Sequence, residues 1–139
     1  MPSSRQSPAP ENFKNHKLRG EWVEMRFMTL AAQHGFTVSR PWGDSAPYDM
    51  MLERDGRVLR VQVKCTTYPC GNSYRCHVTA SGVPYAKEQV DFIAAYIIPL
   101  DVWYIIPAGA PGRHMQILLS PHRKNTRYYE YKEAWHLLL

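Results

Sequence analysis

Apolar residues in the first third of the chain recur at the spacing of one helical face. Between residues 18 and 34, Leu18, Trp22, Met25 and the apolar residues that follow lie mostly three or four positions apart. This period predicts an amphipathic helix of about four turns over residues 18–34. Gly35 comes next, and glycine commonly ends a helix because it adopts the left-handed backbone conformation without strain.

An alternating pattern follows the helix and predicts a β-hairpin. Residues 58–67 contain a clear alternation of apolar and polar side chains, which is the period of a half-buried strand. Residues 48–53 predict a preceding strand, and Asp55-Gly56 between the two is a dipeptide typical of a tight hairpin turn. We therefore expect the two strands to pair antiparallel.

The rest of the pattern predicts more strands and a second helix in the same domain. The order of elements indicates one α/β domain over residues 13–139, with a mixed central sheet flanked by helices. Residues 1–12 are rich in proline and serine and are expected to form a disordered or loosely attached tail. The other expected elements are short strands at 36–40 and 115–119, a loop at 41–47, strands at 74–80, 92–98 and 102–106, a short helix or turn at 84–89, and a C-terminal helix at 128–138.

Composition narrows the class of protein. The chain has 139 residues, and its 17 basic and 12 acidic side chains give a formal net charge of +5. The longest apolar run, residues 92–98, ends at Pro99 and is far shorter than the ~20 residues of a membrane-spanning helix. The chain lacks a signal-peptide core and has three cysteines, an odd number, so we expect a cytoplasmic protein. The basic excess is compatible with a nucleic-acid partner without identifying one.

The polar face of the strand at residues 58–67 contains the candidate chemistry. Gln62 and Lys64 are two residues apart and therefore project from the same face. Antiparallel pairing across the hairpin turn brings Asp49 near them. Glu24 on the first helix reaches the same point if that helix packs on the sheet. A carboxylate pair, an amide and an ammonium group are thus expected to meet.

Such a cluster suits the hydrolysis of phosphodiester bonds with Mg²⁺, which prefers oxygen ligands and retains several waters. We expect Asp49 to supply the main carboxylate, with the side-chain carbonyl of Gln62 and the backbone carbonyl of Val63 as further ligands. Glu24 would bind the metal directly or through a water. Mn²⁺ is expected to substitute for Mg²⁺. Lys64 would orient the attacking water and neutralise charge on the phosphate.

These residues also resemble the motif of the PD-(D/E)XK nuclease superfamily. The likeness extends from about Lys17 to Thr67, and its spacings are similar to those of archaeal Holliday-junction resolvases. Gln62 departs from the usual acidic residue, and this Q-x-K version resembles endonucleases encoded in bacterial group I introns. The matching pieces are Arg19-Gly20 leading into Glu24, Gly35-Phe36, Gly43, Pro47-Tyr48-Asp49 and Val61-Gln62-Val63-Lys64.

The resemblance implies a single restriction-endonuclease-like domain with an α-β-β-β-α-β core. It implies a Mg²⁺-dependent DNA endonuclease, either of homing type or acting on branched DNA, and it makes a homo-oligomer plausible. Because Gln62 removes one negative charge from the site, the alternative is a weak or inactive nuclease-fold protein that binds nucleic acid.

A DNA substrate would need contacts to its backbone phosphates, which provide affinity and salt dependence but not sequence choice. Trp42 precedes Asp49 in the loop, and it either lines the DNA groove or covers the core. The residues predicted to contact DNA are Lys14, Lys17, Arg19, Arg40, Trp42, Arg60, Arg123, Lys124 and Arg127.

Three alternatives concern residues near the proposed site. Glu21 competes with Glu24 as the helix carboxylate, although an acid in the first turn is also favoured by the helix dipole. Asp44 fits a loop or capping residue better than a metal ligand. The cysteines follow a C-x4-C-x5-C spacing without the C-x2-C pair of common zinc sites, so zinc is not predicted.

Overall fold

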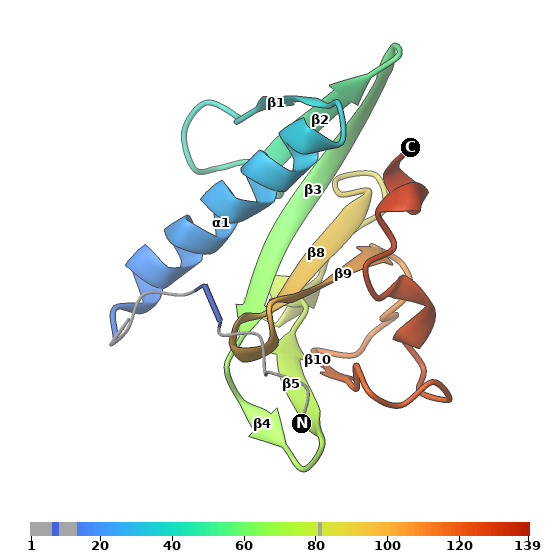
Figure 1. Ribbon diagram of the computed structural model, residues 1–139. Helices are drawn as coiled ribbons and strands as arrows, with labels where there is room; N and C mark the ends of the chain where they lie inside the picture. Colours follow the sequence, from blue (N-terminus) through green and yellow to red (C-terminus); the bar gives the residue numbers. More distant parts are fainter. Residues whose placement is uncertain (1–6, 9–13, 81) are drawn as a thin grey trace.

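The computed structural model describes residues 7–8, 14–80 and 82–139 (Figure 1). The tail predicted at residues 1–12 therefore lies almost wholly outside the described residues. Within it, the Ser7 hydroxyl donates a hydrogen bond to the carbonyl oxygen of Ile98 over 2.7 Å.

The predicted first helix is confirmed as α1 (His16–Gln33), and it begins two residues earlier than expected. The Asn15 side chain caps it by accepting hydrogen bonds from the second and third backbone amides of the helix at 3.0 and 3.2 Å. Gly35 follows the helix with a φ of +89°. No helix among the described residues is both long and apolar enough to cross a membrane.

A five-stranded sheet forms the centre of the molecule, with strands in the order β1-β2-β3-β8-β9. Only β3 and β8 run parallel, so the predicted mixed sheet is confirmed. The strands are β1 (Thr37–Ser39), β2 (Met50–Arg54), β3 (Arg57–Thr66), β8 (Phe92–Ile97) and β9 (Val102–Pro107).

The predicted hairpin connects β2 to β3. Asp55 and Gly56 have φ values of +53° and +78°, the two positive values that a type I′ turn requires. The register pairs Met50 with Val61, so β3 continues well beyond the start of β2. This uncovered length of β3 is where the candidate site forms.

The third strand predicted at residues 74–80 is wrong in its continuity and in its sheet. The chain forms two short strands there, and the break falls at Val78, whose amide hydrogen-bonds to the Met115 carbonyl. Residues 73–77 pair with residues 116–119 in a separate sheet and do not join the central sheet. A separate three-stranded sheet has the order β10-β5-β4, with β10 (Gln116–Leu119), β5 (Ser73–His77) and β4 (Pro69–Cys70), and a small hairpin joins β6 (Thr79–Ala80) to β7 (Val83–Pro84).

Two apolar cores cover the two faces of the central sheet. On one face, α1 contributes Val23, Phe27 and Ala31, which lie four residues apart and are all buried. On the other face, the second sheet contributes Cys76 and Ile117 to a cluster with side chains of β8 and β9. The central sheet is therefore covered by one helix and one small sheet.

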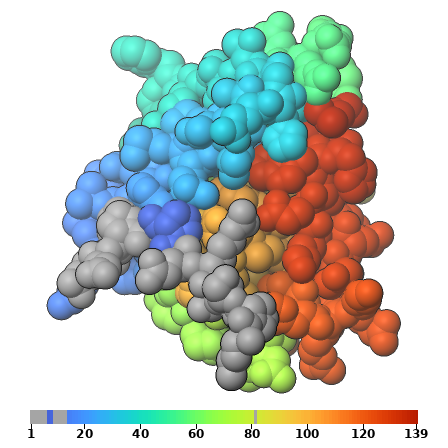
Figure 2. Space-filling view, viewed as in Figure 1, coloured from blue at the N-terminus to red at the C-terminus, as the bar shows by residue number. Residues whose placement is uncertain are grey.

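The predicted C-terminal helix and the expectation of flanking helices are wrong. Residues 128–138 contain two short 3-10 turns, and α1 is the only α-helix in the described residues. Glu133 interrupts the helical path with a φ of +49°; its amide donates to the Trp103 carbonyl at 2.7 Å, and its carboxylate accepts from the Trp103 amide at 3.0 Å. The segment thus docks on β9, and Trp135 stacks on His34 beside the end of α1. In Figure 2 the red C-terminal segment lies directly against the blue-to-cyan surface of α1. In the segment predicted as a helix or turn at 84–89, Pro84 ends β7 and a turn forms at residues 87–89, without a helix.

Truncation of Phe27 should test whether α1 depends on this core. Its ring is fully buried and packs 5.4 Å from the Trp103 ring and 5.5 Å from the Trp135 ring. Phe27→Ala should lower the free energy of unfolding by about 3–5 kcal/mol. Met25→Ala, on the exposed side of the same helix, should change it by less than about 0.5 kcal/mol. Chemical denaturation of both variants measures the difference, and equal losses would contradict the packing.

Candidate active site

Asp49 lies at the point where β2 stops covering the edge of β3. Its amide donates to the Val61 carbonyl at 2.9 Å, and its carboxylate accepts from the Val63 amide at 2.8 Å. The carboxylate thus satisfies an edge amide that a longer β2 would have paired. The strand pairing ends with Met50 opposite Val61, and the bonds of Asp49 to Val61 and Val63 place it near residues 62–64, as the hairpin predicted.

Glu24 reaches the same point from α1. Its carboxyl group shares a hydrogen bond with that of Asp49 and lies 3.4 Å from the Arg40 guanidinium. Glu21 on the same helix is exposed and exerts only a weak electrostatic effect on Glu24. Of the two acids left open by the sequence, Glu24 is the one that meets Asp49.

The two carboxyl groups are in an environment that disfavours a double negative charge. Burial, and next the negative charge of Asp49, raise the pKa of Glu24 from 4.5 to about 7, although Arg40 opposes this shift. Burial also raises the pKa of Asp49, against the hydrogen bond from Val63 and the charge of Lys64. The surroundings of the pair thus favour one shared proton over two negative charges as the pH falls to about 7.

Lys64 is held by groups that the sequence did not single out. Its ammonium group donates to the Thr79 carbonyl at 3.2 Å and lies 5.4 Å from the centre of the Tyr85 ring. The small β6–β7 hairpin therefore positions Lys64 close enough to Asp49 for its positive charge to oppose the burial-driven rise in the Asp49 pKa. No sequence signal marked Tyr85, because only the chain path brings it to β3.

A small hollow of about 140 Å³ adjoins Asp49. Arg40 and Tyr48 line it, and so does Asp44, which the sequence favoured as a loop residue. The hollow gives a ligand access to the Asp49 carboxylate from the loop before β2.

The oxygen atoms at this point fit a hard divalent cation. Val63 donates its amide to Asp49, and the N–H and C=O of one strand residue face the same side, so its carbonyl points to the same open edge. Gln62 makes no side-chain hydrogen bond within the described residues, which leaves its amide oxygen available. With the carboxylates of Asp49 and Glu24, the donor set consists of oxygens. Among the described residues, no three His, Cys, Asp or Glu side chains gather as a metal group.

The predicted DNA contacts fall in three places. Lys14 and Lys17 are exposed at the start of α1, where the Arg19 guanidinium lies 3.0 Å from the His16 ring. Arg40 and Trp42 belong to the loop beside Asp49. The third group, at the other side of the second sheet, consists of Arg123, Lys124 and Arg127, all exposed.

Trp42 and the cysteines are also placed by the structure. The Trp42 side chain is 100% exposed, so the alternative that it covers the core is wrong.

All three cysteines are free, and burial raises the pKa of the Cys76 thiol to about 12. His77 is exposed while Cys76 is buried, so these neighbours face opposite sides of β5.

The prediction that Arg60 contacts DNA does not fit its surroundings. Its guanidinium contacts the Asp91 carboxylate at 3.1 and 3.2 Å and donates to the backbone carbonyls of Lys87 and Glu88. The Arg60 amide also donates to Asp91 at 2.8 Å. These bonds join β3 to the segment before β8, so we assign Arg60 a structural role.

Comparisons with known proteins agree with this arrangement. A family model described as PD-(D/E)XK endonuclease matches residues 14–138. The bacterial homing endonuclease I-Ssp6803I is similar with a TM-score of 0.74 and 27% identity, over 90% of this chain and 91% of that one. The Holliday junction resolvase Hjc of Archaeoglobus fulgidus has a similar fold, with a TM-score of 0.60 and 15% identity over 86% and 94% of the two chains. A comparison with curated protein sequences gives no significant match. The chain belongs to the PD-(D/E)XK endonuclease family.

Proposed function

We propose that this protein is a metal-dependent endonuclease that hydrolyses phosphodiester bonds in DNA. The observation that supports it most is the meeting of the Asp49 and Glu24 carboxyl groups at the open edge of β3. Lys64 lies on the same strand, two residues after Gln62. This is the arrangement expected for hydrolysis of a charged phosphodiester.

Asp49, Glu24, the Gln62 amide oxygen and the Val63 carbonyl would hold the cation. Mg²⁺, or Mn²⁺ in its place, would supply positive charge to the phosphate oxygens and lower the pKa of an attacking water. Lys64 would orient that water and stabilise the negative charge that grows as the oxygen–phosphorus bond forms and the bond to the leaving strand breaks. Tyr85 and the Thr79 carbonyl would keep the ammonium group in position.

The neutral Gln62 is the observation that favours a second candidate function. An amide contributes no charge to a metal site, so cation affinity falls relative to a third carboxylate. The alternative is therefore a weak or inactive nuclease-fold protein that binds nucleic acid through its exposed basic residues. Turnover distinguishes the two, because binding alone would leave the DNA intact.

The substrate form and the oligomeric state are parts of the proposal that follow from likeness to relatives. I-Ssp6803I is described as a homing endonuclease and Hjc as a Holliday junction resolvase, so both linear and branched DNA are candidate substrates.

A homo-oligomer would allow two strands to be cut, and light scattering of the purified protein measures its mass. We expect the protein to act in the cytoplasm, where its DNA substrate would be accessible.

Replacing Asp49 or Lys64 should abolish cleavage. Asp49→Asn removes the central ligand, and Lys64→Ala removes the charge nearest the phosphate, so each should lower the rate at least about 100-fold. The measurement is cleavage of supercoiled plasmid, linear duplex and a four-way junction with Mg²⁺, with Mn²⁺ and with EDTA.

Glu21→Gln is the matched control, since it removes an exposed carboxylate from the same helix as Glu24. It should cut at nearly the rate of the unaltered protein. Full activity in Asp49→Asn would refute the site. Absence of cutting by the unaltered protein, with DNA binding retained, would instead support the binding function.

The carboxyl pair should make stability depend on pH in the absence of metal. Because the folded-state pKa of Glu24 lies above its ordinary value, the unfolding free energy should fall as pH rises from 4.5 through about 7. Glu24→Gln should remove this fall. At pH 8 its Tm should therefore exceed that of the unaltered protein by roughly 4 °C, after discounting for solvent screening.

Differential scanning calorimetry with EDTA at pH 5 and pH 8 measures this effect, and at pH 5 the two proteins should nearly agree. Added Mg²⁺ should stabilise the unaltered protein more at pH 8 than at pH 5, since the cation competes with the shared proton. A Glu24→Gln protein that is less stable at pH 8 would contradict the proposed carboxyl pair.

A further inference from the structure

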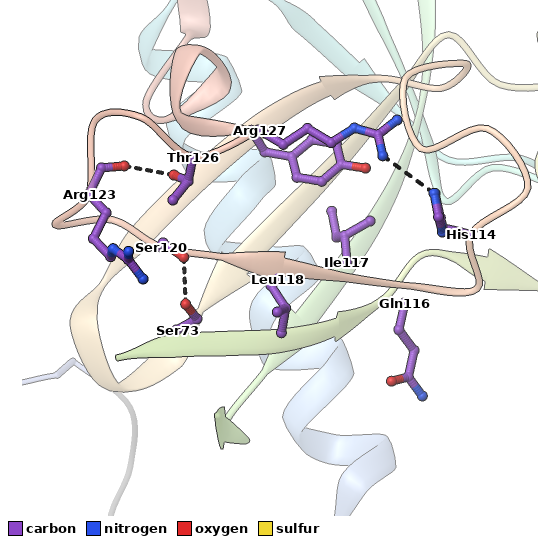
Figure 3. A pocket seen from close by; sticks show the side chains of 10 residues that line it. Ser73, His114, Gln116, Ile117, Leu118, Ser120, Arg123, Thr126 and Arg127 are labelled. Atoms are coloured by element: carbon purple, nitrogen blue, oxygen red, sulfur yellow. Dashed lines mark hydrogen bonds between the residues drawn. The ribbon is translucent and has the colours of Figure 1, made fainter. Parts of the chain in front are cut away.

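A second cavity lies on the small β10-β5-β4 sheet and contains none of the proposed catalytic residues. It has a volume of about 370 Å³, within the range of small-ligand sites. Residues from two distant parts of the chain line it: Ser73 of β5, and the stretch that runs from β10 into the connector at 123–128 (Figure 3). Because Ser73 is far from the other lining residues in sequence, the cavity could not be predicted from a motif.

The charged groups around this cavity are all basic. Arg123, Arg127 and His114 line it, and none of the described lining residues is acidic. The Arg127 guanidinium lies 3.3 Å from the His114 ring, and 5.4 Å from the centre of the Tyr128 ring. In Figure 3, Arg123 lies toward one side of the cavity, and the Arg127–His114 pair lies toward the other. Such a surface attracts an anion from two sides.

Hydroxyl and apolar groups occupy the space between the two basic sides. The Ser73 and Ser120 hydroxyls are buried and paired at 2.5 Å, and the Thr126 hydroxyl donates to the Arg123 carbonyl at 2.7 Å. Leu118 is 49% exposed and lines the same cavity. Arginine is well suited to bind phosphate, and an exposed apolar side chain offers contact to a sugar.

We propose that this cavity binds the sugar-phosphate backbone of a DNA strand at a distance from the bond that is cut. Arg123 and Arg127 would contact phosphates, and Leu118 would pack against a sugar between them. The site would anchor the substrate without taking part in the chemistry. This inference rests on the proposed function, because it assigns a second contact to the same DNA substrate.

The chain path limits the distance between this cavity and the cleavage site. Ser73 lines the cavity, and Thr79, six residues later, accepts a hydrogen bond from Lys64. An extended chain rises ~3.3 Å per residue, so the backbones of Ser73 and Thr79 are at most roughly 20 Å apart. One DNA strand rises ~3.4 Å per nucleotide, so this length of chain corresponds to about six base pairs of DNA.

Variants in which an arginine of the cavity is replaced by the uncharged glutamine test whether the cavity binds DNA. Arg123→Gln and Arg127→Gln should each weaken binding to a linear duplex about tenfold and reduce the slope of log affinity against log salt by about one. Arg57→Gln is the matched control, since Arg57 is exposed at the tip of the β2–β3 hairpin, away from the second sheet (Figure 1). It should change the affinity less than twofold. Fluorescence anisotropy with EDTA measures affinity without cutting, and thermal denaturation checks that each variant is folded.

A second arm distinguishes DNA from a free phosphate compound. Isothermal titration with inorganic phosphate and with deoxyadenosine monophosphate should give much weaker binding than the duplex. If Arg127→Gln abolishes binding of the free compounds but leaves duplex affinity unchanged, the assignment to DNA is overturned. Equal duplex affinities of the cavity variants and Arg57→Gln would also overturn it.

Cleavage of the same duplex by the unaltered protein with Mg²⁺ separates this inference from the proposed function. Cutting, with unchanged binding in both cavity variants, would leave the nuclease function in place and reject the cavity. Absence of cutting, with binding weakened in Arg127→Gln, would support the cavity as a DNA contact and count against the nuclease function.

Discussion

The hydrogen bond from the Val63 amide to the Asp49 carboxylate determines where this protein can perform chemistry. β2 ends before it covers the second half of β3, and an uncovered edge amide needs a partner. Asp49 supplies that partner with its side chain, so the carboxylate lies at the edge with its remaining lone pairs available. The same geometry turns the Val63 carbonyl toward the open space. One interruption of a β-ladder thus produces both a fixed carboxylate and a fixed carbonyl.

Packing of α1 on this sheet brings a second carboxyl group, that of Glu24, to Asp49. Val23 and Phe27 are buried against the sheet, and Glu24, between them in the sequence, is brought to Asp49. Two carboxyl groups so close and so poorly hydrated cannot both carry full charge near neutral pH without compensation. Arg40 and Lys64 supply only part of it. Packing of the apolar core thereby holds the two carboxyl groups together, although their negative charges are only partly compensated.

Local patterns predicted those parts of the fold whose causes are local. The helical period, the Asp55-Gly56 turn and the alternation along β3 each depend on neighbouring residues, and the hairpin correctly brought Asp49 near residues 62–64, where it binds the Val63 amide. The C-terminal segment shows the limit of this reasoning. Its apolar spacing suits a helix, but the bonds between Glu133 and Trp103 hold it against β9 in another conformation. The positions of Tyr85 and of the basic cavity likewise depend on contacts between distant segments, which periodicity does not reveal.

The second sheet connects the central sheet, the proposed catalytic Lys64 and the basic cavity. It covers the face of the central sheet opposite α1, and the Thr66 hydroxyl on β3 donates to the Arg75 carbonyl on β5 at 2.5 Å. The chain leaving β5 then supplies Thr79, which holds Lys64. Because β5 also provides Ser73 to the basic cavity, only the short stretch from Ser73 to Thr79 lies between the proposed anchor and the proposed catalytic lysine. This stretch is hydrogen-bonded to β10 and, through Val78, to Met115, so its backbone sets the spacing between the two points.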